Sequence, residues 1–421
     1  MALCKRPAAD LDGVQGGSAT SCCKRRRLRI GSTADYDKMC CLGEGSFGFV
    51  FKARHRATGK ILAIKVLRSR DVINGEPAVA AANELLHEAR FLEAASAGNR
   101  YVVASHGLVR DLPTKNLCLA MEYVGPSLHA FLHQSPRLPE STVRSFMWQL
   151  LSGAEKMHER GIVHRDIKPA NILVGEDGKI VKMCDLGLAM SLTTQPLYTE
   201  AGTLPYMAPE MLLGKPDYDA RVDTWSLGCV MAELITGETL FKEGRDETGQ
   251  LLDIFRVLGS LDEKTWPEFA SLPRAAMAQL LLQLEEREGR QHKKNLDDFF
   301  SEEMLSDEGF QVLEGLLTCN PDKRLTAAAA LKLPWFAPPT VQPIKNVAPA
   351  TPAKKAPPKM KNVLLIKWNI PRAISKKTKK NVLRVSLAMW TKAQINNIPP
   401  AAALKNKKNI VRIPLALWNK A

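Results

Sequence analysis

The sequence predicts an α+β protein with a β-rich N-terminal lobe and a helical C-terminal lobe. Across residues 35–121, short apolar runs alternate with polar residues between tight turns, as in antiparallel strands. Across residues 127–336, apolar residues recur every three or four positions in several long segments, as in amphipathic helices. Residues 122–126 lie between these patterns and contain Gly125 and Pro126, so we expect them to connect the two lobes.

The distribution of charge separates this folded domain from two basic extensions. The chain of 421 residues has a formal net charge of +15, but residues 35–336 alone carry −8. Residues 1–34 carry +5, and residues 337–421 carry +18 without an acidic residue. We therefore expect an acidic core, a disordered N-terminal extension and a tail that begins with a Pro- and Lys-rich linker.

Composition excludes several classes of protein. No apolar run reaches membrane-spanning length, and Lys5 and Arg6 stand where a secretory signal has an apolar block, so an intracellular protein without a membrane partner is expected. The nine cysteines form no CxxC pair, which argues against disulfides and zinc. The basic run at residues 24–29 indicates nuclear import, so we expect the protein in the nucleus and in the cytoplasm. The alternative, a solvated basic arm that no import receptor binds, has about the same weight.

A glycine-rich turn follows the first predicted strand. We expect strands at residues 39–42, 49–54 and 61–67. A G-x-G-x-x-G turn also occurs in dinucleotide-binding folds, but there a helix opens at the last glycine, whereas here a strand follows. The glycines therefore belong to a hairpin tip, where backbone amides can cover phosphate groups. The residues expected to contact a nucleotide here are Leu42, Gly43, Glu44, Gly45, Ser46, Phe47, Gly48 and Val50.

A lysine at the end of the third strand can complete the phosphate site. Lys65 could reach the nucleotide phosphates if a carboxylate on the next helix holds it in place. Residues 83–95 have helical periodicity, and Glu88 is the expected partner, with Glu84 as the runner-up. Considered alone, Lys65 would be interpreted as a surface lysine. Its place beside the glycine turn favours the phosphate contact.

An adenine site is predicted where the lobes meet. Residues 117–121 have the pattern of a buried strand, and the backbone of residues 122–126 could pair with an adenine edge. Met121 would lie at the back of this site. The other residues expected around the ring are Val50, Ala63, Glu122, Val124 and Leu173, although apolar residues at such positions are more often plain core.

The run His164-Arg165-Asp166-Ile167-Lys168-Pro169-Ala170-Asn171, followed by Asp185-Leu186-Gly187, carries the chemistry. Asp166 can accept a hydroxyl proton, and Lys168 can neutralise a migrating phosphoryl group. Asn171 and Asp185 can hold Mg²⁺ against the phosphates of ATP. A buried histidine with a solvated charge cluster would require neither the asparagine nor the second aspartate. The pattern therefore predicts phosphoryl transfer with ATP and Mg²⁺.

The remaining elements surround this run. Residues 139–160 are expected to form a helix before it, residues 172–184 a hairpin after it, and Asp223 to open a further apolar helix. Glu210 closes the segment that follows Asp185-Leu186-Gly187, and a buried carboxylate there would need a cationic partner. Arg324 is the candidate, and a surface pair is the alternative.

From residue 36 to residue 336 the chain resembles a eukaryotic protein kinase, and within those kinases the cyclin-dependent branch. Leu240-Phe241, residues 250–259 and Pro334-Trp335-Phe336 carry the finer likeness, which is nearest to the plant F-type cyclin-dependent kinases. The resemblance implies a two-lobed protein kinase fold, ATP-dependent transfer to Ser or Thr of a protein substrate, and a role in cell-cycle or transcription control. Lys168 and Thr203 are similar to the catalytic residues of Ser/Thr rather than Tyr kinases.

The resemblance also implies regulatory positions. Thr199 corresponds to the activating phosphorylation site, Arg165 to a residue that receives its phosphate, and Ser46 to a site of inhibitory phosphorylation. Met190 stands where these kinases place a second arginine of the phosphate site, so we expect activation to be partly independent of phosphorylation. The alanine-rich residues 78–82 and His87 depart from the cyclin-contact helix, which puts a cyclin partner in question.

The basic tail contains a repeat. Residues 380–393 return as residues 408–421, and a looser copy starts at Lys361. Apolar runs between lysines, each with a tryptophan, could dock on an acidic partner or on nucleic acid. A tail without a partner, and a strand or helix that folds back on the acidic core, are the alternatives.

Two rival functions remain open at this point. A pseudokinase scaffold would act through its surface and tails without turnover, but it would be expected to lose Lys65, Asp166, Asn171 or Asp185. A kinase of non-proline-directed specificity, acting on the activation loops of other kinases, is the second rival. Met207 allows it, because proline-directed kinases have an arginine at this position.

Overall fold

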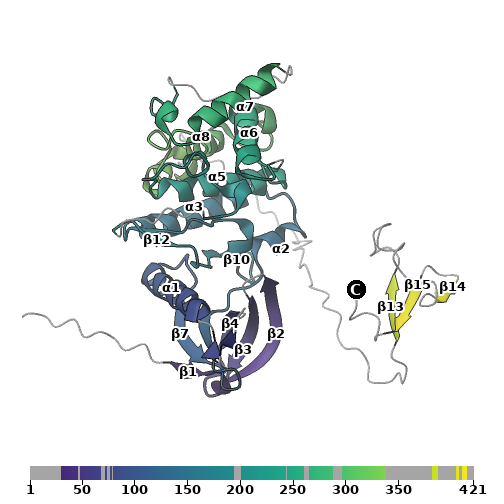
Figure 1. Cartoon of the computed structure of the whole chain (residues 1–421). Helices are drawn as coiled ribbons and strands as arrows, with labels where there is room; N and C mark the ends of the chain where they lie inside the picture. Colours follow the sequence, from purple (N-terminus) through teal and green to yellow (C-terminus); the bar gives the residue numbers. More distant parts are fainter. Residues whose placement is uncertain are drawn as a thin grey trace, which may run out of the picture. The chain divides into compact units, whose positions relative to one another are not determined.

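The computed structural model divides the chain into two compact units, residues 1–342 and residues 343–421. The residues that the structure describes are 30–45, 48–67, 72–73, 76–77, 79–193, 201–242, 244–259, 265–287, 296–337, 382–386, 404–406 and 410–414. The first unit has a β-sheet lobe followed by a helical lobe (Figure 1). This is the α+β, two-lobed arrangement that the sequence predicts.

A six-stranded sheet with the order β1-β7-β8-β4-β3-β2 forms the N-terminal lobe. Its strands are β1 (Gly31–Ser32), β2 (Tyr36–Gly45), β3 (Gly48–His55), β4 (Ile61–Leu67), β7 (Ser105–Arg110) and β8 (Leu117–Glu122). The predicted antiparallel meander is present, since β2 pairs with β3 and β3 with β4. The short strand β1 and the 3-10 helix η1 (Thr33–Asp35) begin before the predicted start at residue 35, because β1 adds to the sheet by pairing parallel with β7.

One helix, α1 (Val79–Ser96), packs against β7 and β8 of this sheet. Leu85, Ala89 and Leu92 are buried on its inner face. The helix begins four positions before the predicted residue 83, because alanine-rich residues 79–82 are strong helix formers. The two-stranded sheet of β5 (Val72–Ile73) and β6 (Glu76–Pro77) precedes it.

The C-terminal lobe is built on helices. They are α2 (Leu128–Leu132), α3 (Glu140–His158), α4 (Pro209–Leu212), α5 (Arg221–Thr236), α6 (Glu247–Leu258), α7 (Ala275–Arg287), α8 (Asp307–Leu316) and α9 (Ala327–Ala330). Short 3-10 helices are η2 (Pro169–Asn171), η3 (Leu204–Tyr206), η4 (Phe269–Ser271), η5 (Leu296–Phe299) and η6 (Pro334–Phe336). Two small hairpin sheets pair β10 (Ile172–Val174) with β11 (Val181–Met183), and β9 (Ile162–Val163) with β12 (Met190–Ser191).

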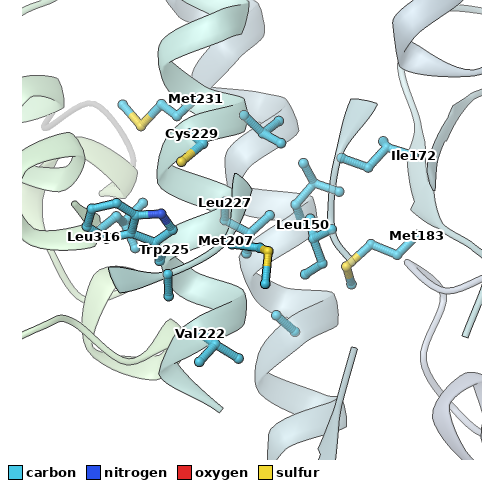
Figure 2. Close-up of a cluster of buried hydrophobic side chains, with 14 of the residues drawn as sticks. Leu150, Ile172, Met183, Met207, Val222, Trp225, Leu227, Cys229, Met231 and Leu316 are labelled. Carbon is cyan, nitrogen blue, oxygen red and sulfur yellow. The ribbon is translucent and has the colours of Figure 1, made fainter. Parts of the chain in front are cut away.

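Helix α5 is the centre of the C-terminal core. Its residues from Val222 to Ile235 are all buried and most of them are apolar, as expected for a helix enclosed by others. In Figure 2, Trp225 of α5 lies beside Leu316 of α8, whereas Leu227 lies towards Leu150 of α3 and the β10–β11 hairpin. Trp225 stacks on Phe241 with ring centroids 5.7 Å apart. This core supports the loop between β9 and β10, which carries the chemistry predicted above.

The connection between the lobes lies close to β10. A Cβ atom on Gly125 would lie 2.1 Å from the carbonyl oxygen of Val174, so no other residue fits without a shift of the backbone. The carbonyl oxygen of Pro126 accepts a hydrogen bond from the Val174 amide at 2.8 Å. None of the helices within the described ranges is both long and apolar enough to cross a bilayer.

The second unit contains the sequence repeat. Strands β13 (Val382–Ser386), β14 (Leu404–Asn406) and β15 (Ile410–Pro414) form a sheet with the order β13-β15-β14. β13 and β15 come from equivalent places in the two copies of the repeat and pair antiparallel, with Arg384 opposite Arg412 at the centre. The tail therefore forms strands by pairing one copy with the other.

Candidate active site

A lysine and two carboxylates form an ion-paired group where the two lobes meet. The Nζ atom of Lys65, on β4, lies 2.8 and 2.9 Å from the two carboxylate oxygens of Glu88 and 2.9 Å from Oδ1 of Asp185. Glu88 comes from α1 and is only 3% exposed. The geometry selects Glu88, rather than the runner-up Glu84, as the partner of Lys65. Both lobes therefore contribute to one charged site.

Burial and the short distances between Lys65, Glu88 and Asp185 shift the pKa values of all three side chains. Burial alone would lower the pKa of Lys65, but the charges of Glu88 and Asp185 raise it above its ordinary value. Burial also opposes ionisation of Asp185, yet the charge and hydrogen bond of Lys65 hold its pKa below the usual range. In Glu88 burial prevails over Lys65 and raises the pKa to about 7. Because two carboxylates share one ammonium group, the more enclosed one is the easier to protonate.

The loop after β9 is held in a strained shape by a buried aspartate. Asp223, in the first turn of α5, accepts hydrogen bonds from the backbone amides of His164 and Arg165 at 2.8 and 2.9 Å. It also contacts Nε2 of His158 at 2.9 Å. Arg165 has φ of 68°, in the left-handed region that non-glycine residues rarely adopt. Asp223 therefore stabilises a backbone turn that places the next residue, Asp166.

Asp185 has the same kind of strain. Its φ is 63°, and the only other described non-glycine residue with positive φ outside this site is Lys115. His164 supports this region too, because its Nε2 lies 3.0 Å from the carbonyl oxygen of Cys184, the residue before Asp185. Two of the three described non-glycine residues with positive φ therefore lie at the site: Arg165, directly before Asp166, and the predicted metal ligand Asp185.

Asp166 is the centre of a network of polar side chains. The hydroxyl of Thr203 donates to its Oδ1 at 2.6 Å, and the Nδ2 atom of Asn171 donates to its Oδ2 at 2.9 Å. Lys168 contacts both neighbours, with Nζ 2.6 Å from the Thr203 oxygen and 2.9 Å from Oδ2 of Asp166. The structure therefore brings together the four residues that the sequence predicts as catalytic.

The predicted metal ligands offer oxygen donors. With the Nδ2 atom of Asn171 hydrogen-bonded to Asp166, its amide oxygen is the atom left to bind a cation. Asp185 uses Oδ1 for Lys65 and has a second carboxylate oxygen. One carboxylate, one amide oxygen and substrate phosphates are the donors that Mg²⁺ prefers, so the residues present fit this metal.

Most of the predicted nucleotide residues lie on β2, β3, β4 and β8, whereas Val124 follows β8 and Leu173 lies on β10. Met121 and Ala63 are buried and directly paired between β8 and β4, whereas Val50, Val124 and Leu173 are only partly buried. Leu42, Gly43 and Glu44 are exposed near the tip of β2. A Cβ atom on Gly48 would lie 2.0 Å from the Val66 carbonyl oxygen, which explains this glycine by close backbone approach. Gly45 ends β2, and Ser46 and Phe47 lie outside the described residues.

The predicted regulatory residues are only partly described. Thr199 lies outside the described residues. Arg165 donates from Nε to the carbonyl oxygen of Leu188 at 2.7 Å and from a terminal nitrogen to the Tyr218 hydroxyl at 3.0 Å. Met190, in place of a second arginine, is 9% exposed and belongs to the apolar core.

The predicted pair of Glu210 and Arg324 is formed in the interior. Two guanidinium nitrogens of Arg324 donate to the two carboxylate oxygens of Glu210 at 2.6 and 2.7 Å. Their side chains are 0% and 1% exposed. The surface alternative is therefore wrong. This bidentate pair fixes the start of α4, directly after the segment that carries Thr203.

Three supporting residues were not predicted from the sequence. Asp223 and His158 hold the catalytic loop, and His87 contacts the carbonyl oxygen of Ala189. One signal was available for Asp223, because an acidic residue at the start of an otherwise apolar helix needs a buried partner. No local pattern points to His87 or His158.

Comparisons with known proteins agree with this site. The family model described as "Protein kinase domain" matches residues 36–336. The chain is 42% identical over 323 residues to a "Putative cyclin-dependent kinase F-2" of Oryza sativa subsp. japonica, covering 73% of this chain and 93% of that protein. It is 34% identical over 310 residues to "Cyclin-dependent kinase 14" of Callithrix jacchus, covering 73% and 69%. With "Cyclin-dependent kinase G-1" of Oryza sativa subsp. indica it shares 33% over 362 residues, covering 82% of this chain but only 50% of that protein.

The chain therefore belongs to the protein kinase family. Within it, these relatives place the chain among the cyclin-dependent kinase-like Ser/Thr kinases, which use ATP as the phosphoryl donor. The predicted fold and enzyme class are confirmed, and the pseudokinase alternative is set aside.

Proposed function

We propose that this site transfers the γ-phosphoryl group of ATP to a Ser or Thr hydroxyl held at Asp166. The contact between the Thr203 hydroxyl and Oδ1 of Asp166 carries the proposal, because it shows that this carboxylate accepts a hydrogen bond from an alcohol. A substrate hydroxyl in the same relation would be oriented for in-line attack and would pass its proton to Asp166. Lys168, which lies beside both atoms, would balance the charge on the transferred group.

The remaining roles follow from position. Lys65, fixed by Glu88, would contact the α and β phosphates, and the backbone of the glycine-rich turn would cover them. Asn171 and Asp185 would hold Mg²⁺, which supplies charge neutralisation at the phosphates when bound. Val50 and Leu173 would face the adenine ring, and Met121 would limit the back of that site. Catalysis would then depend mainly on positioning and charge.

A cavity beside Thr203 supports a preference for an apolar residue after the acceptor. It has a volume of about 610 Å³ and is lined by Gly202, Leu204 and Met207 on one side. Asp246 and Glu247, at the start of α6, line the other side. Because Gly202 and Leu204 flank Thr203, the residue next to an acceptor at Asp166 would enter this cavity. An apolar side chain with a basic residue nearby fits this lining, and Met207 in place of an arginine favours the non-proline-directed alternative.

A peptide pair tests both proposals. Residues 380–392 of the chain contain Ser386 followed by Leu387 in a basic sequence, and the matched peptide carries Leu387→Pro. Purified full-length chain with ATP and Mg²⁺ is expected to phosphorylate the leucine peptide about tenfold more efficiently, because one well-placed apolar group contributes roughly 1–3 kcal/mol of discrimination. Mass spectrometry would locate the phosphate.

Two controls accompany this assay. A Ser386→Ala peptide should accept no phosphate at that position, and the Asp166→Asn enzyme should transfer none to any peptide. Better transfer to the proline peptide would refute the specificity proposal, whereas transfer by Asp166→Asn at the normal rate would refute the site. The assay begins without a cyclin, because residues 78–82 and His87 depart from the cyclin-contact helix; repeating it with cyclins tests that partner.

Regulation by phosphate is proposed at two positions. A phosphate on Thr199 would compete with the Leu188 carbonyl and the Tyr218 hydroxyl for Arg165, and a phosphate on Ser46 would repel those of ATP. The proposed protein substrates are the activation loops of other kinases. The proposed biological role is cell-cycle or transcription control, and the similarity to cyclin-dependent kinases supports this role.

The basic extensions support a proposal on location and partners. Residues 24–29 would direct nuclear import, with part of the protein remaining in the cytoplasm, and the tail would bind an acidic partner or nucleic acid. Removal of residues 1–34 is expected to shift a fluorescently tagged chain out of the nucleus. An unchanged nuclear signal, compared with a Lys5→Ala control, would contradict the import proposal.

A further inference from the structure

His87 joins helix α1 to the segment that follows Asp185. Its Nε2 atom lies 2.9 Å from the carbonyl oxygen of Ala189, 102 residues later in the chain. A carbonyl oxygen can only accept, so Nε2 must carry the hydrogen of this bond. The ring of His87 also packs on Phe91, one turn further along α1, with ring centroids 4.7 Å apart. The contact with Phe91 therefore helps to orient the imidazole towards the carbonyl oxygen of Ala189.

Ala189 lies in a segment that is fixed from both lobes. The preceding carbonyl, that of Leu188, accepts a hydrogen bond from Arg165 in the catalytic loop. The following residue, Met190, pairs with Val163 in the β12–β9 sheet. Two successive carbonyls are thus held by one side chain from the catalytic loop and one from α1. A displacement of α1 would break the second of these contacts.

The same helix carries Glu88, the next residue. Neighbouring residues on a helix point about 100° apart, so Glu88 faces Lys65 while His87 faces Ala189. Together the two contacts fix both the rotation and the position of α1 relative to the site. Because Glu88 is buried, the cost of removing its charge from water offsets part of its attraction to Lys65, so a second contact on α1 helps to keep Glu88 at Lys65.

We propose that His87 is a positioning residue, which keeps α1 in the orientation where Glu88 meets Lys65 without pressure from a partner protein on this helix. The inference rests on the proposed phosphoryl transfer, since it assigns His87 a part in that reaction through Lys65. The hydrogen-bond donor at Nε2 is the essential property. Another side chain of similar length that donates an N–H to the Ala189 carbonyl oxygen should therefore preserve the function of the imidazole.

Three variants of the full-length chain test this inference. His87→Ala removes the donor, His87→Gln supplies an amide N–H, and Glu84→Ala alters an exposed residue on the same helix. We expect His87→Ala to lower kcat/KM for the peptide about fivefold and to raise the KM for ATP, as loss of one hydrogen bond would. His87→Gln should stay within about twofold of the unchanged protein, and Glu84→Ala should equal it. Because the side chain of His87 is exposed, all three variants should fold, with thermal midpoints within about 4 °C of the unchanged protein.

Amide hydrogen exchange supplies a readout that does not depend on turnover. Exchange in peptides from residues 83–95 should become faster in His87→Ala and not in the other two variants. Equal turnover and exchange in all variants would overturn the inference, and so would a His87→Gln protein as impaired as His87→Ala. If the unchanged protein transferred no phosphate, the proposed function would fail, and the exchange comparison alone would decide the role of His87.

Discussion

Replacing Asp185 by asparagine is expected to lower phosphoryl transfer about a thousandfold or more, which corresponds to roughly 4 kcal/mol of activation free energy. The change removes the anionic oxygen proposed to hold Mg²⁺ and leaves the side-chain volume almost unchanged. Glu88 still pairs with Lys65, and an amide oxygen at position 185 can still accept from Lys65. The protein should therefore fold normally and bind peptide, yet transfer very slowly.

Peptide phosphorylation and circular dichroism measured on the same preparation check this prediction. Asp177→Asn is the matched control, since Asp177 lies in the exposed turn between β10 and β11 and accepts a hydrogen bond from the Lys179 amide. It makes the same chemical change outside the site and should leave turnover unchanged. Normal turnover in a folded Asp185→Asn protein would show that the metal site has been assigned to the wrong residue.

The Arg324→Met variant is expected to lose about 3–5 kcal/mol of unfolding free energy, because it leaves the Glu210 carboxylate buried without its cation. Arg324 also donates to the carbonyl oxygens of Thr318 and Cys319, so several acceptors lose their partner at once. The guanidinium also lies 5.1 Å from the ring centroid of Trp225. The substitution therefore also removes a contact with the core around α5. Urea denaturation followed by tryptophan fluorescence would measure it.

A double variant separates the two causes of this loss. Glu210→Gln together with Arg324→Met removes the unpaired charge and should recover about 1 kcal/mol or more relative to Arg324→Met alone. Lys242→Met is the control for an exposed pair, since Lys242 and Glu238 are 59% and 70% exposed, and it should cost less than about 1 kcal/mol. A double variant less stable than the single one would show that the lost carbonyl contacts, rather than the charge, dominate.

The parts of the site that the sequence predicted are those with short, well-spaced motifs. Asp166, Lys168 and Asn171 lie within six residues of one another, and the structure places them together with Thr203. Lys65 and Glu88 could be matched because a strand end followed by one helix leaves few partners. Short, local patterns also explain why the observed bounds of strand β4 and of the β10–β11 hairpin agree closely with the predicted ones.

The contacts that escaped prediction join segments without any local signal. Asp223 meets His164 across 59 residues, and His87 meets Ala189 across 102. Only the packing of α1 and α5 against the loops brings these groups together. The pairing of β13 with β15 is another example. The repeat itself is visible in the sequence, but its apolar and basic pattern does not say which copy pairs with which.

The distance along the chain between Glu210 and Arg324 has a consequence for biosynthesis. The two residues are 114 positions apart. At about 5–20 residues per second, a ribosome needs about 6–23 s to add the arginine after the glutamate. During that time the Glu210 carboxylate has no buried cationic partner. The start of α4, which follows the segment with Thr203, therefore cannot yet be fixed in its final position. A nascent kinase is therefore kept from closing its C-terminal lobe until almost the whole catalytic domain has been synthesised.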